Sequence, residues 1–417
     1  MSLSAPVAGT SPTSRSPLIA LRHRDFRLYW GGQMVSTAGS MMQTAAVAWQ
    51  VYLLTHSAVA LGLIGLVRVG PIVVFSLGGG VVADAIDRRR LLMVTQTALL
   101  LTSVGLALLT LSGHISIWLI YLLTAIAAAA LAFDSPARQA LVPSLVPRAH
   151  LPNALSLNGT MFQTASVVGP SLAGVVIATR GVASVYLLDA VSFLAVLAVL
   201  FVIRPPRLAA EGRSISLDAA FEGLRFVFRT PILLSTMFLD FVATFFGSAI
   251  ALLPIFAHDI LHVGSQGYGL LYAAPAMGSI LAGVTMAFIA GHIIHQGRTI
   301  IVAVMIYAVC TTLCGLSHVF LLSLFFLAGT GAADTVSMIL RQTVRQIVTP
   351  DELRGRMTSV SMVFFMGGPQ LGEFEAGMLA RALGASFSVI SGGIAALLAT
   401  GVIAVYGARL RQYKRQS

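Results

Sequence analysis

Three ionisable side chains lie deep inside long apolar stretches of this sequence. Arg68 stands about nine residues from one end of its stretch, and Glu373 and Glu375 stand about six to eight residues from an end of theirs. Because each helical residue adds about 1.5 Å, we expect the three groups at similar depth. A charge at the centre of a membrane helix costs about 2.5 to 3.5 kcal/mol, so charges that occur there are candidates for binding a ligand or a proton.

Two aspartates and two glutamines add to this set of polar candidates. Asp189 and Asp240 also interrupt apolar stretches. Each is either a proton-binding group or a structural hydrogen-bond partner of a neighbouring helix. Gln33 and Gln43 belong to a run of polar residues spaced three to four apart, so several of them share one helix face. That face is either the wall of a cavity or a polar packing surface between helices.

Two further aspartates stand a few residues before an arginine. Asp134 precedes Arg138, and Asp334 precedes Arg341, in each case near the end of an apolar stretch. Spacings of this kind favour ion pairs at helix ends, and a role in gating is the alternative.

The composition shows which elements must position these groups. Of 417 residues, 57% are hydrophobic and only 10% are charged, whereas a soluble domain carries about 25% charged residues. The apolar stretches are long enough to cross a bilayer as helices, and a lipid bilayer is the expected surrounding. We therefore predict an all-α polytopic membrane protein with twelve transmembrane helices. The spans are expected near residues 28-54, 59-83, 91-112, 116-138, 154-179, 183-203, 231-257, 267-291, 299-316, 319-340, 357-380 and 385-407.

The distribution of arginine predicts the orientation of the chain. Alternate connections between spans carry arginine clusters, while the other set carries only Arg180 and Arg381. Basic residues in short loops are retained on the cytoplasmic side. Both termini are therefore predicted to be cytoplasmic, which requires an even number of spans in a multi-pass protein of the cell (inner) membrane.

The chain divides into two related halves. Arg138-Gln-Ala recurs as Arg341-Gln-Thr, and Gly169-Pro170 recurs as Gly368-Pro369. This repeat indicates a duplication, and two parallel six-helix repeats around a central cavity are a plan used by transporters. The predicted parts are a cytoplasmic tail (1-24), a six-helix bundle (25-203), a cytoplasmic linker with an amphipathic helix (204-230), a second six-helix bundle (231-407) and a short cytoplasmic tail (408-417).

Several classes of protein are excluded by the sequence. The net charge of +11 comes from short clusters between apolar runs, so no nucleic-acid partner is expected. A phosphate-binding loop needs Gly-Lys-Ser/Thr, and the only lysine, Lys414, lies three residues from the end, so no ATP-driven motor is expected. No hydrolase motif is present, and the chain is not predicted to be an enzyme. His258 and His262 have metal-ligand spacing, but no third ligand is evident, so no metal site is predicted.

A motif between the second and third spans gives the first specific resemblance. It reads Gly80-Val-Val-Ala-Asp84-Ala-Ile-Asp87-Arg88-Arg89-Arg90. This resembles the signature that joins helices 2 and 3 in the major facilitator superfamily, with Ala85 in place of the expected Arg and Asp87 in place of the expected Gly. The resemblance implies that Asp84 faces the start of the eleventh span, near Arg354, and closes the cytoplasmic side. The alternative is a charge cluster that only sets the topology.

A motif in the fifth span narrows the resemblance. Gly169, Pro170 and Gly174 lie in Ala165-Ser-Val-Val-Gly-Pro-Ser-Leu-Ala-Gly174, which is similar to the signature of exporting, antiporter-type members of the superfamily. Small residues let helices approach closely, and a proline deletes one backbone hydrogen bond. Over about residues 21 to 406 the chain resembles the drug and siderophore efflux branch, including the enterobactin-exporter group.

The resemblance implies a secondary transporter that exports a small amphipathic molecule by alternating access, without a cofactor and with the proton gradient as the energy source. We hypothesise that Arg68 pairs with Glu373 or Glu375 when one gate is closed, and that protonation of the acid releases it. Residues two apart point about 200° away from each other on a helix, so one glutamate is expected to face the cavity. A static ion pair is the alternative for this pair, and an anionic substrate is a second partner for Arg68.

Two other functions stay open at this level. The same fold can serve a proton-coupled uptake symporter, because export is implied only by the motif in the fifth span. A membrane sensor without transport is the other alternative, although it leaves the duplication without a purpose. The sequence specifies neither the oligomeric state nor the individual substrate.

Overall fold

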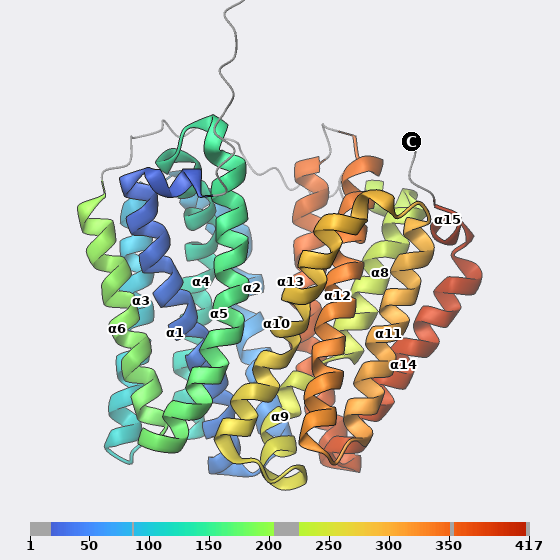
Figure 1. Cartoon of the computed structure of the whole chain (residues 1–417). Helices are drawn as coiled ribbons and strands as arrows, with labels where there is room; N and C mark the ends of the chain where they lie inside the picture. The colour runs from blue at the N-terminus through green and yellow to red at the C-terminus, as the bar shows by residue number, and fades with distance from the viewer. Residues whose placement is uncertain (1–17, 86, 204–224, 351–353, 414–417) are drawn as a thin grey trace, which may run out of the picture.

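The computed structural model describes residues 18–85, 87–203, 225–350 and 354–413, and every element within them is helical (Figure 1). Short helices fill the turns, while the long ones run the full height of the molecule. The elements of the N-terminal half are η1 (Ile19–Arg22), α1 (Arg24–Thr55), α2 (Ala58–Ala85), α3 (Arg88–Leu111), α4 (Ile117–Leu145), η2 (Arg148–His150), α5 (Leu151–Arg180) and α6 (Val182–Val202). Those of the C-terminal half are α8 (Pro231–Phe246), η3 (Ala249–Leu252), α9 (Leu253–Ile255), η4 (Phe256–Ile260), α10 (Gly264–Ile289), η5 (Ala290–His292), α11 (Gln296–Leu316), α12 (Phe320–Val348), α13 (Arg354–Leu383), α14 (Ala385–Tyr406) and α15 (Ala408–Arg411).

The predicted all-α membrane fold is confirmed. Within the described part of the chain, ten helical segments are long and apolar enough to cross a bilayer. The helices α1 and α13 have 32 and 30 residues and run alongside them (Figure 1). α1 carries the glutamines and serines noted above, and several of them are buried against neighbouring helices.

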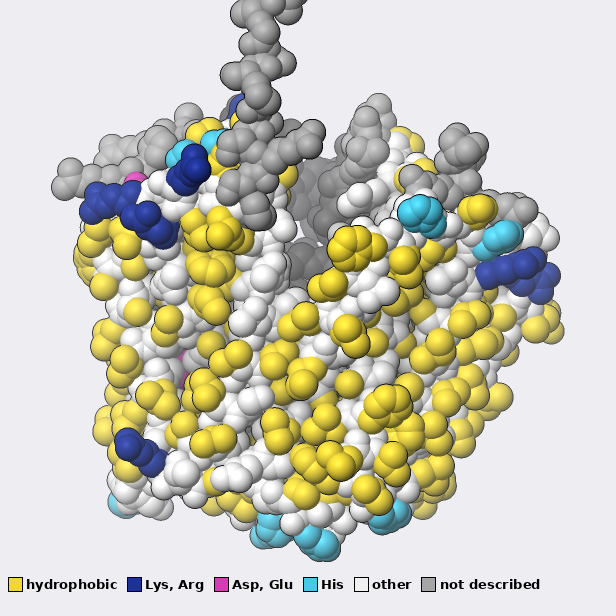
Figure 2. Space-filling view, viewed as in Figure 1, with side chains coloured by type: hydrophobic (Ala, Val, Ile, Leu, Met, Phe, Trp, Pro, Cys, Tyr) yellow, Lys and Arg dark blue, Asp and Glu magenta, His cyan; other side chains and the backbone are white. Residues whose placement is uncertain are grey.

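Large hydrophobic side chains cover the sides of the molecule (Figure 2). Leu281, Phe288, Leu321 and Phe325 are among the many that are more than two thirds exposed. A soluble protein rarely exposes so large an apolar surface, whereas a lipid environment favours it. The structure therefore is that of a multi-pass membrane protein.

The helices α1–α6 pack mainly against one another, as do α8–α14, and the two groups meet through α2 against α13 and α5 against α10. Both pairs cross near the end of the molecule that lies away from the chain termini (Figure 1). We call this the closed end. At the other end, which we call the open end, the surface is hollowed between the two halves, and most arginines in view gather there (Figure 2).

The seventh span is broken rather than continuous. After α8 the chain passes Gly247, a 3-10 turn (Ala249–Leu252) and a five-residue π-helix (Phe256–Ile260). Such backbone is tolerated at membrane depth only where protein buries it or where it lines a cavity. The bundle boundaries proposed from the sequence stay a prediction, and most of the linker, residues 204–224, lies outside the described part of the chain.

Candidate functional site

A cavity of about 230 Å³ lies inside the N-terminal half and reaches α13 of the other half. Its wall combines one charge with amide and hydroxyl groups on an apolar background. Arg68 of α2 and Gln43 of α1 are in this wall, as the polar pattern of the sequence suggested. The remaining polar lining residues are Ser40, Thr44, Thr124 and Gln370.

Arg68 and Glu373 lie on facing helices of the two halves. The Glu373 carboxylate packs against α2 at Gly65, where a Cβ would lie 3.0 Å from its Oε2. The charge of Arg68 acts on the carboxyl group of Glu373, and both charges act on Tyr272 of α10. Among the described residues the two side chains form no direct ion pair. Release of such a pair by protonation stays a prediction.

Glu375 occupies a different face of α13 from Glu373. It is half-buried, and no charged partner acts on it in the described part of the chain. The helical rotation of about 200° between residues two apart accounts for this difference. Of the two glutamates, Glu373 is therefore the one that the fold directs towards Arg68.

Asp189 of α6 is fully buried in the N-terminal half. The hydroxyl of Ser103 in α3 donates to its Oδ2 at 2.8 Å, and the amide of Gln43 donates to Ser103 Oγ at 3.0 Å. A hydrogen-bonded path thus leads from the cavity wall to this carboxyl group. Hydropathy alone gave no sign of the role of Ser103, because it depends on how α1, α3 and α6 meet.

Gln33 is also buried in α1, but it is not among the residues that line the cavity with Arg68 and Gln43. Both its amide nitrogen and its amide oxygen lack a hydrogen-bond partner within the described part of the chain. Its shared helix face with Gln43 therefore does not extend the cavity wall.

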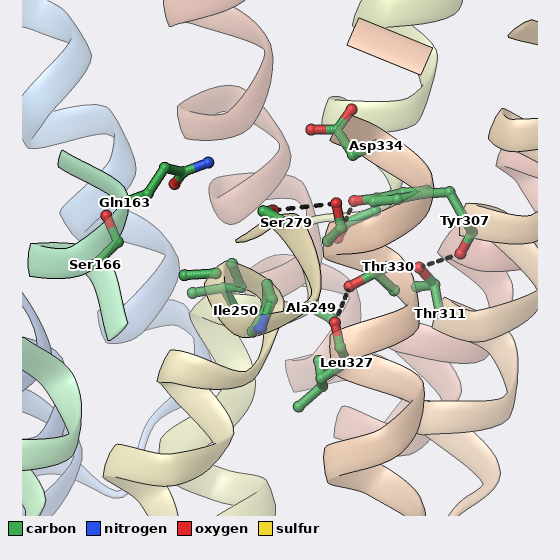
Figure 3. A pocket seen from close by; sticks show the side chains of 14 residues that line it. Gln163, Ser166, Ala249, Ile250, Ser279, Tyr307, Thr311, Leu327, Thr330 and Asp334 are labelled. Carbon is green, nitrogen blue, oxygen red and sulfur yellow. Dashed lines mark hydrogen bonds between the residues drawn. The ribbon is translucent and has the colours of Figure 1, made fainter. Parts of the chain in front are cut away.

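A second cavity of about 250 Å³ lies between the halves. Figure 3 shows Gln163 and Ser166 of α5 on one side, facing Ile250 of the broken seventh span. On the other side Tyr307 donates to the carbonyl of Gly247 at 3.0 Å. Gln163 and Ser166 are polar residues in an otherwise apolar helix, and this was the signal in the sequence that could have identified them.

Asp240 forms a buried ion pair in the C-terminal half. Arg341 Nη2 of α12 lies 2.9 Å from Asp240 Oδ1 of α8 and 3.2 Å from Asp334 Oδ1. Arg341 is 1% exposed, so two carboxylates share one desolvated cation. The predicted pairing of Asp334 with Arg341 is present, and Asp240 joins it.

The equivalent position in the N-terminal half carries a similar arrangement. Arg138 forms an ion pair with Asp134 one turn earlier on α4, as predicted. Thr95 and Gln96 of α3 donate to the same carboxylate at 2.9 and 2.8 Å. These bonds satisfy a fully buried acid and tie α3 to α4.

The motif between α2 and α3 acts within the N-terminal half. Asp87 is the N-cap of α3 and accepts from the amides of Arg89 and Arg90. Arg88 donates to the carbonyl of Ala140 at 3.1 Å. Arg89 donates to the carbonyls of Leu200 and Phe201 at the end of α6. These arginines therefore hold the C-terminal ends of α4 and α6 against α3.

The expected contact of Asp84 with the start of α13 lies outside the described residues. Gly80 and Asp84 are helical in α2, but side chains from 76 to 86 are not described. The same holds for the side chains of Arg354 and its neighbours.

The motif in α5 lies at close contacts with two neighbouring helices. Gly169 packs on α1, where a Cβ would lie 2.6 Å from Met41 Cβ. Gly174 packs on Gly269 of α10, and the Pro170 carbonyl faces the same glycine. A side chain at either glycine would collide with backbone, so these residues set the spacing between α5 and its neighbours.

A cluster of polar and aromatic residues joins the halves at the closed end. The Tyr52 hydroxyl of α1 donates to Asp259 Oδ2 in the π-helix, and His258 Nδ1 lies 2.6 Å from Asp259 Oδ1. The rings of His56 and His258 are 6.0 Å apart. Tyr268 of α10 donates to the carbonyl of Ala45 at 3.0 Å. Within the described part of the chain, no group of three or more His, Cys, Asp or Glu residues has the geometry of a metal site.

In the described part of the chain, two groups of helices meet at the closed end and enclose a cavity between them, which is the arrangement of a secondary transporter that works by alternating access. The chain matches the model of the transmembrane secretion effector family of the major facilitator superfamily over residues 15–417. It belongs to this family, which confirms the resemblance found in the sequence and places the chain among transporters rather than enzymes.

Named relatives extend over nearly the whole chain. The enterobactin exporter EntS of Escherichia coli is 26% identical over 396 residues, which is 94% of this chain and 94% of that protein. The enterobactin exporter EntS of Citrobacter koseri is 29% identical over 341 residues, 81% of each chain.

Solved structures share the fold at low identity. A bacterial homologue of the lysosomal transporter Spinster, inward-facing and unoccupied, superposes with a TM-score of 0.75 at 14% identity, covering 97% of this chain and 100% of that one. A bacterial homologue of the iron transporter ferroportin, also inward-facing, gives a TM-score of 0.69 at 17% identity, covering 93% and 99% of the two chains.

Proposed function

We propose that this protein exports an anionic, hydroxyl-rich small molecule of the catecholate siderophore type across the bacterial inner membrane, driven by the proton gradient. The observation that carries the proposal is the composition of the cavity in the N-terminal half. Arg68 supplies a cation, and the amide oxygen of Gln370 is buried without a hydrogen-bond partner in the described part of the chain. A ligand with an anionic oxygen and neighbouring hydroxyl groups satisfies both.

The names of the relatives support the same class of cargo. Both relatives named above are enterobactin exporters, and the alignment with one of them covers 94% of both chains. The apolar residues of the cavity wall, among them Leu99, Leu123 and Phe193, suit the aromatic rings of such a ligand.

We also propose that both termini are cytoplasmic. Most arginines in view lie at the open end (Figure 2), and the first and last described residues lie at the same end (Figure 1), as the bias of basic residues to the cytoplasmic side requires. In this orientation the structure faces inward, ready to take cargo from the cytoplasm. Reporter fusions at the C-terminal tail and after Gly113 test the orientation, and equal signals at both sites would overturn it.

Transport is tested in proteoliposomes that hold the purified protein in one orientation. Labelled enterobactin should move from the cytoplasmic face of the protein to its outer face when an inward proton gradient is imposed, and should stop when an ionophore dissipates the gradient. Movement with the proton instead of against it would identify an uptake symporter. No proton-driven movement of enterobactin would contradict the proposed function.

The charge of Arg68 is tested by a matched pair of variants. Arg68→Ala should weaken enterobactin binding at least tenfold, because a charge-assisted hydrogen bond in a desolvated site is lost. Arg68→Lys keeps the charge without the planar fork and should have the smaller effect. Equal binding by wild type and Arg68→Ala would remove this residue from the binding site.

A further inference from the structure

Asp189 differs from the other buried acids because no described cation lies at ion-pair distance from it. It is 0% exposed, and its hydrogen-bond donors are Ser103 Oγ at 2.8 Å and Ser192 Oγ at 3.4 Å. From α1 it faces the backbone of Gly39, where a Cβ would lie 2.7 Å from Oδ1. Tyr186, one turn away on α6, directs its hydroxyl to Gln50 instead.

Two other buried acids, Asp134 and Asp240, have arginine partners. Asp134 and Asp240 each have an arginine at ion-pair distance, so their charge is already compensated. No charged group acts on Asp189 in the described part of the chain, and a proton is the means by which its charge can be neutralised. Asp189 can therefore gain or lose a proton without the rearrangement of an ion pair.

Ser103 connects Asp189 to the cavity by a chain of two hydrogen bonds. Its Oγ lies 2.8 Å from Asp189 Oδ2, 3.0 Å from Gln43 Nε2 and 3.1 Å from the Leu99 carbonyl. A hydroxyl has a single hydrogen to donate and two lone pairs that accept. The hydrogen of Ser103 can therefore serve either Asp189 or the Leu99 carbonyl at one time.

The hydrogen bonds between Gln43, Ser103 and Asp189 have two arrangements, which follow from these numbers of donors and acceptors. With Asp189 ionised, Ser103 donates to the carboxylate and accepts from Gln43. With Asp189 protonated, the new carboxyl hydrogen is donated to Ser103 Oγ, and the Ser103 hydrogen turns to the Leu99 carbonyl. Every donor is satisfied in both states, and one proton enters or leaves without moving a helix.

We propose that Asp189 carries the transported proton, and that Ser103 and Gln43 couple it to the cargo. This inference rests on the proposed proton-driven export and names the acid that serves it. In the ionised state Gln43 must use its amide nitrogen towards Ser103, which leaves its amide oxygen for a ligand in the cavity.

The sign of the coupling between cargo binding and proton binding follows from cooperativity between these hydrogen bonds. A cargo hydroxyl that donates to Gln43 Oε1 polarises the amide and strengthens its donation to Ser103, which in turn strengthens the bond to ionised Asp189. Cargo binding therefore favours loss of the proton, and proton binding favours loss of the cargo. This reciprocity is what an antiporter requires.

The protonation part of the proposal is tested without any cargo. Infrared difference spectra of the full-length protein in lipid, recorded between low and high pH, should show the stretch of a buried protonated carboxyl group that titrates. The band should vanish in Asp189→Asn, which keeps the side-chain shape. In Ser103→Ala its titration midpoint should move to higher pH, because the ionised form loses its main donor. Ser192→Ala is the matched control and should shift the midpoint less, because the Ser192 hydroxyl lies 3.4 Å from the carboxylate and only 2.6 Å from the Asp189 main-chain carbonyl, which takes its single hydrogen.

The coupling part uses enterobactin as the probe. Adding it to the wild-type protein in weakly buffered detergent solution should release protons, detected with a pH indicator, and Asp189→Asn should release none while still binding enterobactin. A titrating band unchanged in Asp189→Asn, or unchanged proton release by that variant, would overturn the assignment. If the wild type binds no enterobactin, the proposed cargo fails, while the infrared result still decides whether Asp189 titrates.

Discussion

Gly174 of α5 and Gly269 of α10 lie face to face at the closed end, where a Cβ on Gly174 would lie 3.1 Å from the Cα of Gly269 and one on Gly269 would lie 3.0 Å from the Cα of Gly174. The second crossing between the halves, α2 with α13, also places two glycines against each other. A Cβ on Gly62 of α2 would lie 3.1 Å from the Cα of Gly377 of α13. Close backbone contact at two crossings is thus how the two halves seal this end.

Gly174→Ala should disfavour the closed state of this end. The added methyl group would lie 2.5 Å from the Ser265 carbonyl, and overpacking of this kind costs about 1 to 3 kcal/mol. A change of that size shifts a two-state equilibrium about 5- to 150-fold. Spin labels at Ser112 and His318, on exposed loops of the two halves, should report longer distances by pulsed electron resonance.

The matched control is Gly159→Ala in the same helix, because a Cβ there meets nothing within 4 Å. It should leave the distance distribution unchanged. A Gly174→Ala protein with the wild-type distribution would show that the contact of α5 with α10 does not hold the end closed.

Tyr52→Phe should loosen the same end through a different contact. It removes the hydroxyl that links α1 to Asp259 across the halves, a bond expected to contribute about 1 kcal/mol. The closed state should lose about fivefold in population in the same spin-label experiment. In Tyr121→Phe the lost bond goes to the Ala60 carbonyl within the N-terminal half, so the distances should stay as in wild type.

Arg341→Met should destabilise the C-terminal half. It leaves Asp240 buried without its cation, and breaking a buried pair on one side costs about 3 to 5 kcal/mol. The midpoint of thermal unfolding in detergent should fall markedly. The double variant Asp240→Asn with Arg341→Met also removes the charge of the more deeply buried carboxylate and should recover most of the loss, because the remaining acid, Asp334, has a partly exposed side chain. If the double variant is no more stable than the single one, the pair is not what Arg341 stabilises.

Glu373→Gln should impair proton-driven export, while Glu375→Gln should leave it nearly unchanged. The carboxylate of Glu373 balances Arg68 at the crossing of α2 with α13, whereas Glu375 has no charged partner in the described part of the chain. Without this counter-charge Arg68 should hold an anionic cargo more tightly, so binding should tighten while turnover slows. Equal export rates in the two variants would contradict a specific role for Glu373.

Much of this protein follows from the sequence alone. Long apolar stretches and the scarcity of charge predict a bundle of membrane helices, because insertion into lipid depends on local composition. The pairing of Asp134 with Arg138 follows from helical spacing. Similar depth for Arg68 and Glu373 follows from counting residues along two helices.

Only the tertiary structure decided which groups meet across helices. Asp240 pairs with Arg341 a hundred residues away, and Asp189 reaches the cavity through Ser103 and Gln43. Hydropathy and helical rise fix the depth of a side chain, but not the rotation of each helix about its axis or the choice of its neighbour. Those depend on close packing at positions such as Gly39 and Gly174, which many residues far apart in the chain determine together.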